Sequence, residues 1–264
     1  MPETDLALIT RVAQEAGEIA LRHFRRDVTT WDKPDGAGPV TEADLAVNAH
    51  LAEHLRAARP EYGWLSEETE DSDARLGAER LFIIDPIDGT RAFLDGARDW
   101  GISVAVVHGT RPVAAAVVMP ARETTYAAAL GEGATRDGAP IRVSAEAAVE
   151  QATVLTARPN LHAHHWQDGT PPPFQRSFRS SLAFRLALVA EGRFEAMLTL
   201  RPTWEWDIAA GALLVTEAGG AVTDRQTRPL RFNNADPRLS GVLAAGAVHD
   251  AIAGRLAADP GVIV

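Results

Sequence analysis

An apolar run that ends in two carboxylates constrains this chain more than any other stretch. In LFIIDPIDGT, the residues Leu81–Ile84 lead directly into Asp85, and Asp88 follows three residues later with Gly89 and Thr90 behind it. Four consecutive apolar residues are typical of a strand that is buried on both faces. The carboxyl end of such a strand is where open α/β sheets commonly bind ligands. The run therefore predicts an α/β fold with both carboxylates at a ligand-binding edge.

Two interpretations of this carboxylate pair stay open from the residues alone. Asp, Pro and Gly suit turns, so Asp85 and Asp88 could be ordinary turn residues. Buried carboxylates are otherwise costly unless they are paired, hydrogen-bonded or bound to a metal ion. If a helix begins at Gly89 and Thr90, its free backbone N–H groups form an anion site beside the acids. A cation site next to an anion site indicates an enzyme that acts on phosphate.

Three further acids have simple structural explanations when each is taken alone. Glu67, with Glu68 beside it in WLSEETED, could belong to a solvated acidic loop. Asp44 lies three residues after Thr41, which is the spacing of a capping box at the start of a helix. Asp207 opens the helix expected in WDIAAGALLVTEAGG, where free amides and the helix dipole favour an acid.

Helix and strand patterns alternate along the chain. Apolar spacing predicts helices over residues 6–24, 41–55, 181–192 and 206–220. In the second of these, Thr41 is the expected cap, and Leu45, Leu51 and Leu55 are the expected inward-facing residues. Hairpins are expected over 101–120 and 124–143, and a strand near 152–156. The segment 31–40, which contains two Pro and two Gly, is expected to be an irregular loop.

Charge and composition limit the partners. The formal net charge is −10, which argues against nucleic acid as the main partner because phosphate neutralisation requires a basic face. The chain has no cysteine, so disulfides and thiolate metal sites are excluded. The longest apolar runs are far shorter than a membrane span, and the N-terminus lacks a basic segment followed by an apolar one. We therefore expect a cytoplasmic protein that does not bind membranes.

Taken together and in this order, PVTEAD, SEE, DPIDGT and WDIAAG resemble the signature of the inositol monophosphatase superfamily. These are magnesium-dependent, often lithium-sensitive phosphatases, and the resemblance covers nearly the whole chain. It implies the α/β sugar-phosphatase fold, with alternating layers of helices and sheets. It also implies an active site between an N-terminal half, residues 1–145, and a C-terminal half, residues 146–264, in a homodimer.

The resemblance further implies a set of metal ligands. Ligation by carboxylate and carbonyl oxygens is what a hard cation such as Mg²⁺ requires, and two or three Mg²⁺ ions are expected in each active site. Their ligands would be the side chains of Glu67, Asp85, Asp88 and Asp207 and the carbonyl oxygen of Ile87.

In the implied mechanism, water activated by a metal ion attacks phosphorus directly, without a covalent enzyme intermediate. Asp44 and Thr90 orient that water and accept its proton, and Glu67 assists from the metal side. The phosphate of a small metabolite lies against Gly89 and Thr90. Lys33 approaches this phosphate from the loop KPDGAGPVT, which is one residue longer than the common form.

The second half of the chain carries the substrate preference. Its segments RSSLAFRLALVAEG and RPTWEWDIAAG are similar to bacterial 3'(2'),5'-bisphosphate nucleotidases, which implies that adenosine 3',5'-bisphosphate is converted to AMP. Arg185, with Arg179 and Arg201, would bind the second phosphate, unless these are ordinary surface arginines. Leu200 stands where inositol monophosphatases have a glutamate that contacts inositol, and Trp100–Gly101 resembles histidinol-phosphate phosphatases. Inositol 1-phosphate and histidinol phosphate therefore remain alternative substrates.

Two further interpretations stay open. Trp204 and Trp206 flank Glu205 beside the WDIAAG motif, and they could form a wall for a nucleobase or simply pack. A regulatory protein that binds the transcription machinery is the alternative from another class, because some members of the superfamily have that role. Every expected metal ligand is present, and this favours the enzyme.

Overall fold

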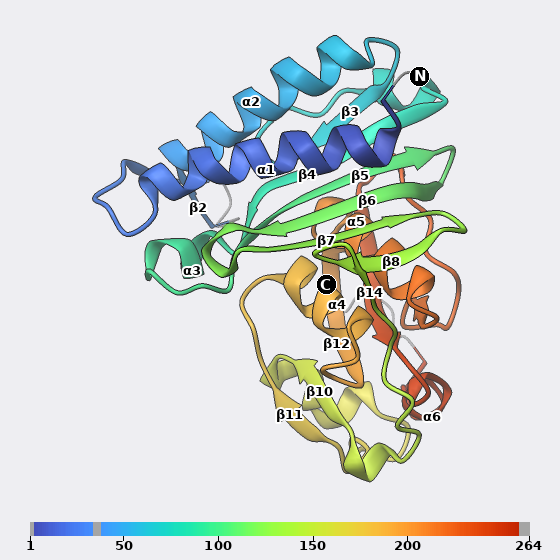
Figure 1. Ribbon diagram of the computed structural model, residues 1–264. Coiled ribbons are helices and arrows are strands. Elements are labelled where there is room, and N and C mark those ends of the chain that lie inside the picture. The colour runs from blue at the N-terminus through green and yellow to red at the C-terminus, as the bar shows by residue number, and fades with distance from the viewer. Residues whose placement is uncertain (1–2, 34–37, 259–264) are drawn as a thin grey trace.

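Helices and sheets alternate in layers across the molecule (Figure 1). The computed structural model describes residues 3–33 and 38–258. The α-helices of this part are α1 (Asp5–His23), α2 (Glu42–Ala58), α3 (Thr90–Leu94), α4 (Leu182–Ala190), α5 (Glu205–Glu217) and α6 (His249–Ala253). Seven strands form one sheet in the order β3 (Gly63–Ser66), β4 (Arg80–Asp88), β5 (Gly101–His108), β6 (Arg111–Met119), β7 (Thr124–Ala129), β8 (Gly133–Arg136) and β9 (Ala139–Pro140). A five-stranded sheet has the order β11 (Gln175–Ser177), β10 (Thr153–Thr156), β12 (Ala196–Trp204), β14 (Arg238–Ala245) and β13 (Ala221–Thr223).

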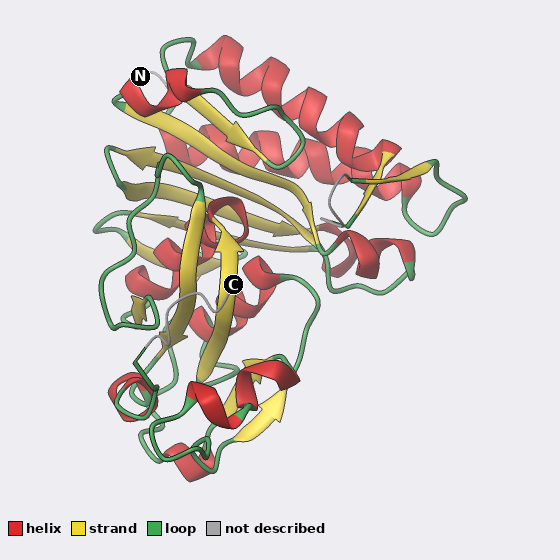
Figure 2. Ribbon diagram, turned by 180° about the vertical axis from the view of Figure 1, so that it is seen from behind, coloured by secondary structure: helices red, strands yellow, loops and turns green. Residues whose placement is uncertain are grey.

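Strand β4 confirms the buried strand that the apolar run predicts. Its side chains alternate between two hydrophobic cores, as a pleated strand requires. Leu81 and Ile83 pack in one core with residues of α4 and α5, whereas Phe82 and Ile84 pack in another with residues of α1 and α2. All four side chains are fully buried. The strand therefore lies between two helical layers, and Figure 2 shows helices on both sides of this sheet.

Helices α4 and α5 lie between the two sheets. Their core includes β4 residues on one side and Met197, Val242 and Ala244 of the five-stranded sheet on the other. A third core covers the opposite face of the five-stranded sheet. It contains Ile252, which belongs to α6, and Trp166, which lies in the segment before β11. This succession of layers confirms the predicted α/β class. The division of the chain into halves at residue 145 stays a prediction.

Helix α2 begins where the capping pattern predicts it. Thr41 accepts hydrogen bonds from backbone N–H groups of the first turn, and Asp44 closes the capping box. Leu51 and Leu55 are buried, but the inward orientation predicted for Leu45 is wrong, because this side chain is 45% exposed. The buried face repeats every fourth residue from Ala43, and Leu45 lies about 200° around the helix from that position.

The irregular loop predicted over residues 31–40 is only partly correct. Strand β1 (Thr30–Asp32) pairs antiparallel with β2 (Pro39–Thr41), so the two ends of the segment form a short ladder. The Pro and Gly residues that suggested a loop obscured this pairing. Residues 34–37, including Pro34 and Gly36, lie outside the described residues.

The predicted hairpins are confirmed. Strands β5 and β6 are joined at Gly109–Thr110, and β7 pairs antiparallel with β8. Helix α5 ends at Glu217, and Gly219 follows in the left-handed region at φ +89°, as expected for a C-terminal cap. Across residues 3–33 and 38–258, no helix combines the length and the apolar character needed to cross a membrane.

Contact between α4 and α5 depends on a glycine, and this gives a stability prediction. A Cβ atom at Gly211 would lie 2.5 Å from Leu186 Cβ, which is too close for any real contact. We expect Gly211→Ala to force the helices apart and to reduce the free energy of unfolding by about 1–3 kcal/mol, as overpacked cores do. Urea denaturation measures the change. Gly77→Ala is the matched control, because a Cβ there meets nothing within 4 Å; equal stability of both variants would contradict the prediction.

Candidate active site

Three predicted acids meet where β4 ends and α5 begins. Asp85, Asp88 and Asp207 each offer a ligand atom, and these atoms lie within 4.8 Å of one another. The first two are 1% and 6% exposed. The pairing of β4 with β5 shifts register between Asp85 and Asp88, an irregularity that re-aims side chains at the end of a strand. The turn interpretation alone does not explain why Asp85 and Asp88, two buried carboxylates of strand β4, converge with Asp207 of helix α5.

The Asp85 side chain shows what this cluster needs. Its Oδ1 atom is buried and has no hydrogen-bond partner in the part of the chain that the structure describes. Burial first, and then the charges of neighbouring carboxylates, raise the pKa of Asp85 and of Asp207 well above the usual value. A divalent cation would satisfy the free oxygen and offset the repulsion. The donor set consists of carboxylate oxygens, so it fits a hard cation such as Mg²⁺.

Asp88 is held by the start of α4. Its Oδ2 atom accepts hydrogen bonds from Ser181 Oγ and from the Ala183 backbone N–H, both at 2.6 Å. Burial raises the pKa of Asp88 to about 6, against the opposing effect of these donors. Ser181 also accepts the Phe184 N–H as the cap of α4. Sequence reasoning missed Ser181, although a serine at the first position of the predicted helix was a signal for a capping residue.

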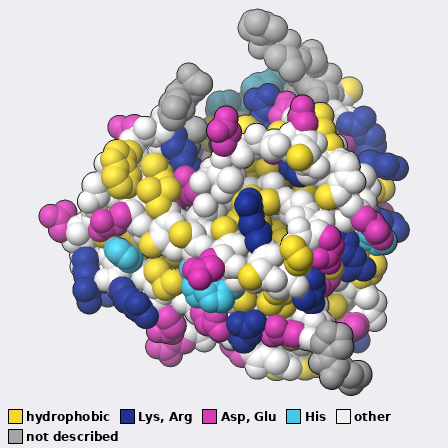
Figure 3. Space-filling model, turned by 90° about the horizontal axis from the view of Figure 1, so that it is seen from above, with side chains coloured by type: hydrophobic (Ala, Val, Ile, Leu, Met, Phe, Trp, Pro, Cys, Tyr) yellow, Lys and Arg dark blue, Asp and Glu magenta, His cyan; other side chains and the backbone are white. Residues whose placement is uncertain are grey.

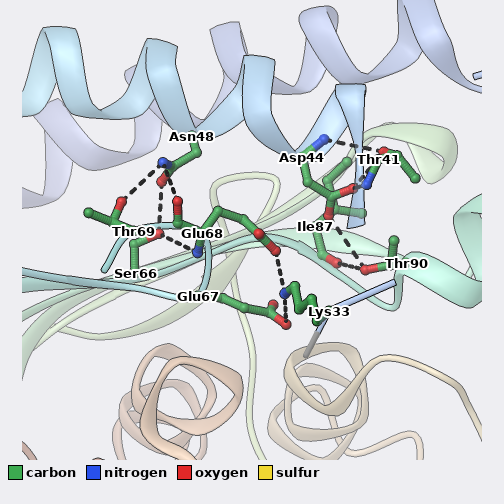
Figure 4. Close-up of polar contacts among 10 residues, drawn as sticks. All are labelled: Lys33, Thr41, Asp44, Asn48, Ser66, Glu67, Glu68, Thr69, Ile87 and Thr90. Atoms are coloured by element: carbon green, nitrogen blue, oxygen red, sulfur yellow. Dashed lines mark hydrogen bonds and ion pairs between the residues drawn. The ribbon is translucent and has the colours of Figure 1, made fainter. Parts of the chain in front are cut away.

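Asp44 links the start of α2 to the start of α3 (Figure 4). Its Oδ2 atom accepts hydrogen bonds from the Thr41 backbone N–H at 2.9 Å and from Thr41 Oγ1 at 2.5 Å. Thr90 Oγ1 lies 3.5 Å from Asp44 Oδ1 and 3.2 Å from the carbonyl oxygen of Ile87. Burial is the main cause that raises the pKa of Asp44 to about 6. Asp44 is therefore both a capping residue and the partner of Thr90.

Lys33 joins two acids of the SEE segment, as Figure 4 shows. Its Nζ donates to Glu67 Oε1 at 2.7 Å and to Glu68 Oε1 at 2.5 Å. Glu68 is not a solvated loop residue, because its side chain is 6% exposed and burial raises its pKa to about 7. Asn48 of α2 donates to the Glu68 carbonyl oxygen and to Thr69 Oγ1. Asn48 was missed, since it carries no motif of its own; Glu68 belongs to the SEE motif, but no role was predicted for it.

Gly89 adopts a conformation that other residues rarely reach. Its φ is +98°, and a Cβ atom there would lie 2.8 Å from the Asp99 carbonyl oxygen. Helix α3 begins at the next residue, Thr90, which confirms the predicted helix start. The glycine thus lets β4 turn sharply into α3, directly after Asp88.

Two residues linked to substrate choice are buried. Arg185 is 5% exposed; its Nε donates to the Arg179 carbonyl oxygen at 2.5 Å, and its guanidinium stacks 4.3 Å from the Phe178 ring centroid. Burial lowers the pKa of Arg185 to about 10. Leu200 is 6% exposed and belongs to the hydrophobic core behind the five-stranded sheet. Arg185 therefore braces the segment before α4, and Leu200 packs away from the carboxylates.

A cavity of about 520 Å³ borders Glu67 and the start of α5, but Asp85, Asp88 and Asp207 are not among its lining residues. Ser66, Glu67, Trp204, Trp206 and residues 235–238 contribute to its lining. The two tryptophan rings stack with centroids 4.6 Å apart and planes at 10°. Trp204 is 37% exposed, so it offers aromatic surface as well as packing against Trp206.

The carboxylates predict a specific pH dependence of stability once divalent cations are removed. The pKa values of Asp44 and Asp88 rise from 3.8 to about 6 on folding, so the folded protein keeps protons that the unfolded chain has released. The stability that these groups contribute is lost as pH rises through about 6. With EDTA present, we expect the melting temperature to fall by several degrees between about pH 5 and pH 7.5.

Excess Mg²⁺ provides the control for this experiment. A bound cation favours the ionised carboxylates, so it should raise the melting temperature at about pH 7.5 and flatten the pH dependence. The Asp85→Asn variant should respond less to Mg²⁺ than the wild type, because it lacks one carboxylate of the cluster. A slope that Mg²⁺ leaves unchanged in the wild type would contradict a cation site here.

Comparisons with known proteins agree with this geometry. The model of the inositol monophosphatase family matches residues 1–259. An inositol-1-monophosphatase of Rhizobium meliloti is 36% identical over 82% of this chain and 81% of its own, and Nus factor SuhB of Pseudomonas aeruginosa is 35% identical over 84% and 85%. A 3'-phosphoadenosine 5'-phosphate phosphatase of Mycobacterium leprae is 33% identical over 89% of this chain and 87% of its own. The solved IMPase of Thermotoga maritima superposes with a TM-score of 0.79 at 28% identity, covering 93% and 94% of the two chains. The chain thus belongs to the inositol monophosphatase family, and it is a phosphoric monoester hydrolase.

Proposed function

We propose that this chain is a Mg²⁺-dependent phosphatase that converts adenosine 3',5'-bisphosphate to AMP. The convergence of Asp85, Asp88 and Asp207 carries the phosphatase part of the proposal. The Asp44–Thr90 pair lies next to this cluster, because Thr90 follows Asp88 by two residues. Buried acids that share one site, beside a hydroxyl–carboxylate pair, suit metal-assisted hydrolysis of a phosphate ester.

In this proposal, two or three Mg²⁺ ions are held by oxygen atoms of the DPIDGT segment, Glu67 and Asp207. When bound, Mg²⁺ polarises the phosphate and makes water a stronger nucleophile. The unpartnered Asp85 oxygen and the raised pKa of Asp207 support these acids as ligands, since burial and neighbouring carboxylates outweigh the charges of Arg201 and Lys33 at Asp207. The Ile87 carbonyl oxygen supplies a further ligand, and it lies within reach of the Thr90 hydroxyl.

Asp44 and Thr90 are the proposed groups that orient the attacking water and accept its proton. The Thr90 hydroxyl orients the water, and the Asp44 carboxylate accepts its proton as the water oxygen bonds to phosphorus. The bond from phosphorus to the 3'-ester oxygen breaks, and this oxygen takes a proton from solvent and leaves as the 3'-hydroxyl of AMP. A pKa of about 6 leaves Asp44 largely ionised near neutral pH, yet basic enough to take a proton. Glu67 assists from the metal side, and Lys33 holds its carboxylate.

The substrate phosphate binds at the turn after β4. The positive φ of Gly89 brings the backbone of Gly89 and Thr90 beside the carboxylates. Lys33 is the proposed cation beside the phosphate. Its Nζ lies against Glu67 and Glu68, and this pairing holds the ammonium group at the acidic site. Arg185 is the proposed contact for the second phosphate of the nucleotide. Its guanidinium also donates to the carbonyl oxygens of Arg179 and Ser180, so Arg185 holds this segment in place as well.

The aromatic cavity is the observation that favours a nucleotide. Trp204 and Trp206 stack beside Glu67, and stacking on aromatic rings binds nucleobases. The similarity to the Mycobacterium leprae phosphatase, whose name specifies a phosphorylated adenosine, supports the same choice. Inositol 1-phosphate and histidinol phosphate are the alternative substrates. Leu200 does not support inositol, because its side chain is buried in a hydrophobic core and cannot contact inositol hydroxyls.

A regulatory role is the second candidate. The relative from Pseudomonas aeruginosa is named a Nus factor, so binding of the transcription machinery is proposed as an alternative or added function. The face seen in Figure 3 mixes acidic and basic side chains rather than gathering basic ones, which does not favour nucleic acid as the main partner there. The homodimer and the cytoplasmic location stay predictions.

The proposed proton acceptor gives a kinetic prediction. We expect Asp44→Asn to lower kcat about 100-fold or more, because general bases typically contribute at least that factor. The substituted amide oxygen can still accept the Thr41 hydrogen bonds, so the melting temperature should change far less than the rate. Phosphate release in excess Mg²⁺ measures the effect. Asp95→Asn, an exposed acid close in sequence to the site, is the control and should keep full activity; equal rates for the two variants would contradict the role of Asp44.

The nucleotide preference has its own test. Phosphate release is compared for adenosine 3',5'-bisphosphate, inositol 1-phosphate and histidinol phosphate, and the nucleotide should win by about 100-fold in kcat/KM, equivalent to about 2.7 kcal/mol. Trp204→Ala should raise KM for the nucleotide alone, because the other two substrates carry no nucleobase. Turnover that favours inositol or histidinol phosphate would overturn the substrate and leave the phosphatase intact; no turnover on any would favour the regulatory candidate.

A further inference from the structure

A second cluster of ligand atoms lies on the helix pair α1 and α2, which run side by side above the seven-stranded sheet (Figure 1). Glu15 of α1 and His50 and His54 of α2 each offer a ligand atom, and these atoms lie within 4.8 Å of one another. All three side chains are partly exposed, so an ion can reach them from solvent. We propose that Glu15, His50 and His54 form a second metal site, which binds a transition-metal ion such as Zn²⁺.

His54 is oriented as a metal-binding histidine usually is. Its Nδ1 atom lies 3.0 Å from the His50 carbonyl oxygen. A carbonyl oxygen can only accept, so Nδ1 must carry the proton, and the lone pair is left on Nε2. Ligating histidines in proteins typically donate their other ring N–H to a carbonyl or carboxylate in this way. The backbone of α2 therefore fixes both the tautomer and the direction of the His54 ring.

His50 presents its Nε2 atom to Glu15. This atom is buried and lies 3.3 Å from Glu15 Oε2, so a bound cation would take the place of the proton between them. The two imidazole rings are 4.2 Å apart, as expected for neighbours one turn along a helix. Burial, followed by the charge of His54, lowers the pKa of His50. Metals bind the deprotonated ring nitrogen, so a bound ion displaces any proton that His50 Nε2 carries.

Glu15 supplies the third ligand and is itself held in place. Its Oε1 atom accepts a hydrogen bond from Arg11 Nη1 at 3.0 Å, which leaves Oε2 directed towards His50. Burial acts against ionisation, but hydrogen bonds from Arg11 and His50 keep the pKa of Glu15 below its usual value. Glu15 and His54 therefore each have a second contact that orients them, and the His50 ring packs against the His54 ring.

The ligand types distinguish this cluster from the carboxylates at the end of β4. Two imidazoles and one carboxylate suit Zn²⁺ in a tetrahedral site, with one position left for water. Mg²⁺ prefers oxygen ligands throughout, so it selects the other cluster. The ion would connect α1 to α2 and would stabilise the helical layer that covers β4.

The test is calorimetric titration of the full chain with Zn²⁺ in the presence of excess Mg²⁺, which occupies the carboxylate cluster. We expect one Zn²⁺ per chain and a rise in melting temperature. His50→Gln and His54→Gln, each at a partly exposed helical position, should weaken Zn²⁺ binding by about 100-fold, and Arg11→Gln by about tenfold. The Mg²⁺-dependent phosphatase activity of these variants should stay at the wild-type level.

Two control variants make the outcome decisive. The double variant His164→Gln and His165→Gln removes a neighbouring pair of histidine rings elsewhere in the chain and should bind Zn²⁺ as the wild type does. Asp85→Asn should also retain Zn²⁺ binding, because that change affects only the carboxylate cluster. The proposal is overturned if the wild type binds no Zn²⁺, if His50→Gln and His54→Gln bind it unchanged, or if Asp85→Asn abolishes binding.

Discussion

Burial of β4 on both faces is the constraint on which the rest of the structure depends. Leu81 and Ile83 are covered by one helical layer, and Phe82 and Ile84 by another. Burying such side chains contributes about 1.5–3 kcal/mol each, so the strand holds its place firmly. The same burial removes water from the acids that follow, and this raises the pKa of Asp85 and Asp88. Burial of β4 therefore both stabilises the strand and creates a site in which the carboxylates are best satisfied by a cation.

Much of this arrangement is readable from the sequence. The apolar run before Asp85 identifies a buried strand, and Thr41 with Asp44 identifies the start of α2. These features depend on short-range patterns, in which each residue type has few structural options. The grouping of Asp85 and Asp88 with Asp207, more than a hundred residues away, required the resemblance of several motifs rather than any single spacing.

What could not be predicted depends on neighbours that are distant in the chain. The exposure of Leu45 follows from how α2 sits on the sheet, and a wide apolar pattern leaves several inward faces possible. Glu68 and Asn48 reach the site through contacts with Lys33 and Thr69, which no local motif encodes. The pairing of Glu15 with His50 likewise arises only when α1 packs beside α2. Long-range contacts of this kind decide which polar residues share a site.

The hydrogen bonds from Ser181 and Ala183 to Asp88 have a consequence for motion. They join the start of α4 to the end of β4 at 2.6 Å, across residues far apart in the sequence. Any rotation that separated α4 from β4 would break both bonds and leave a buried carboxylate without donors, at substantial cost. We therefore expect α4 and the end of β4 to move as one unit, so that the frame around the carboxylates keeps its geometry while substrate enters and product leaves.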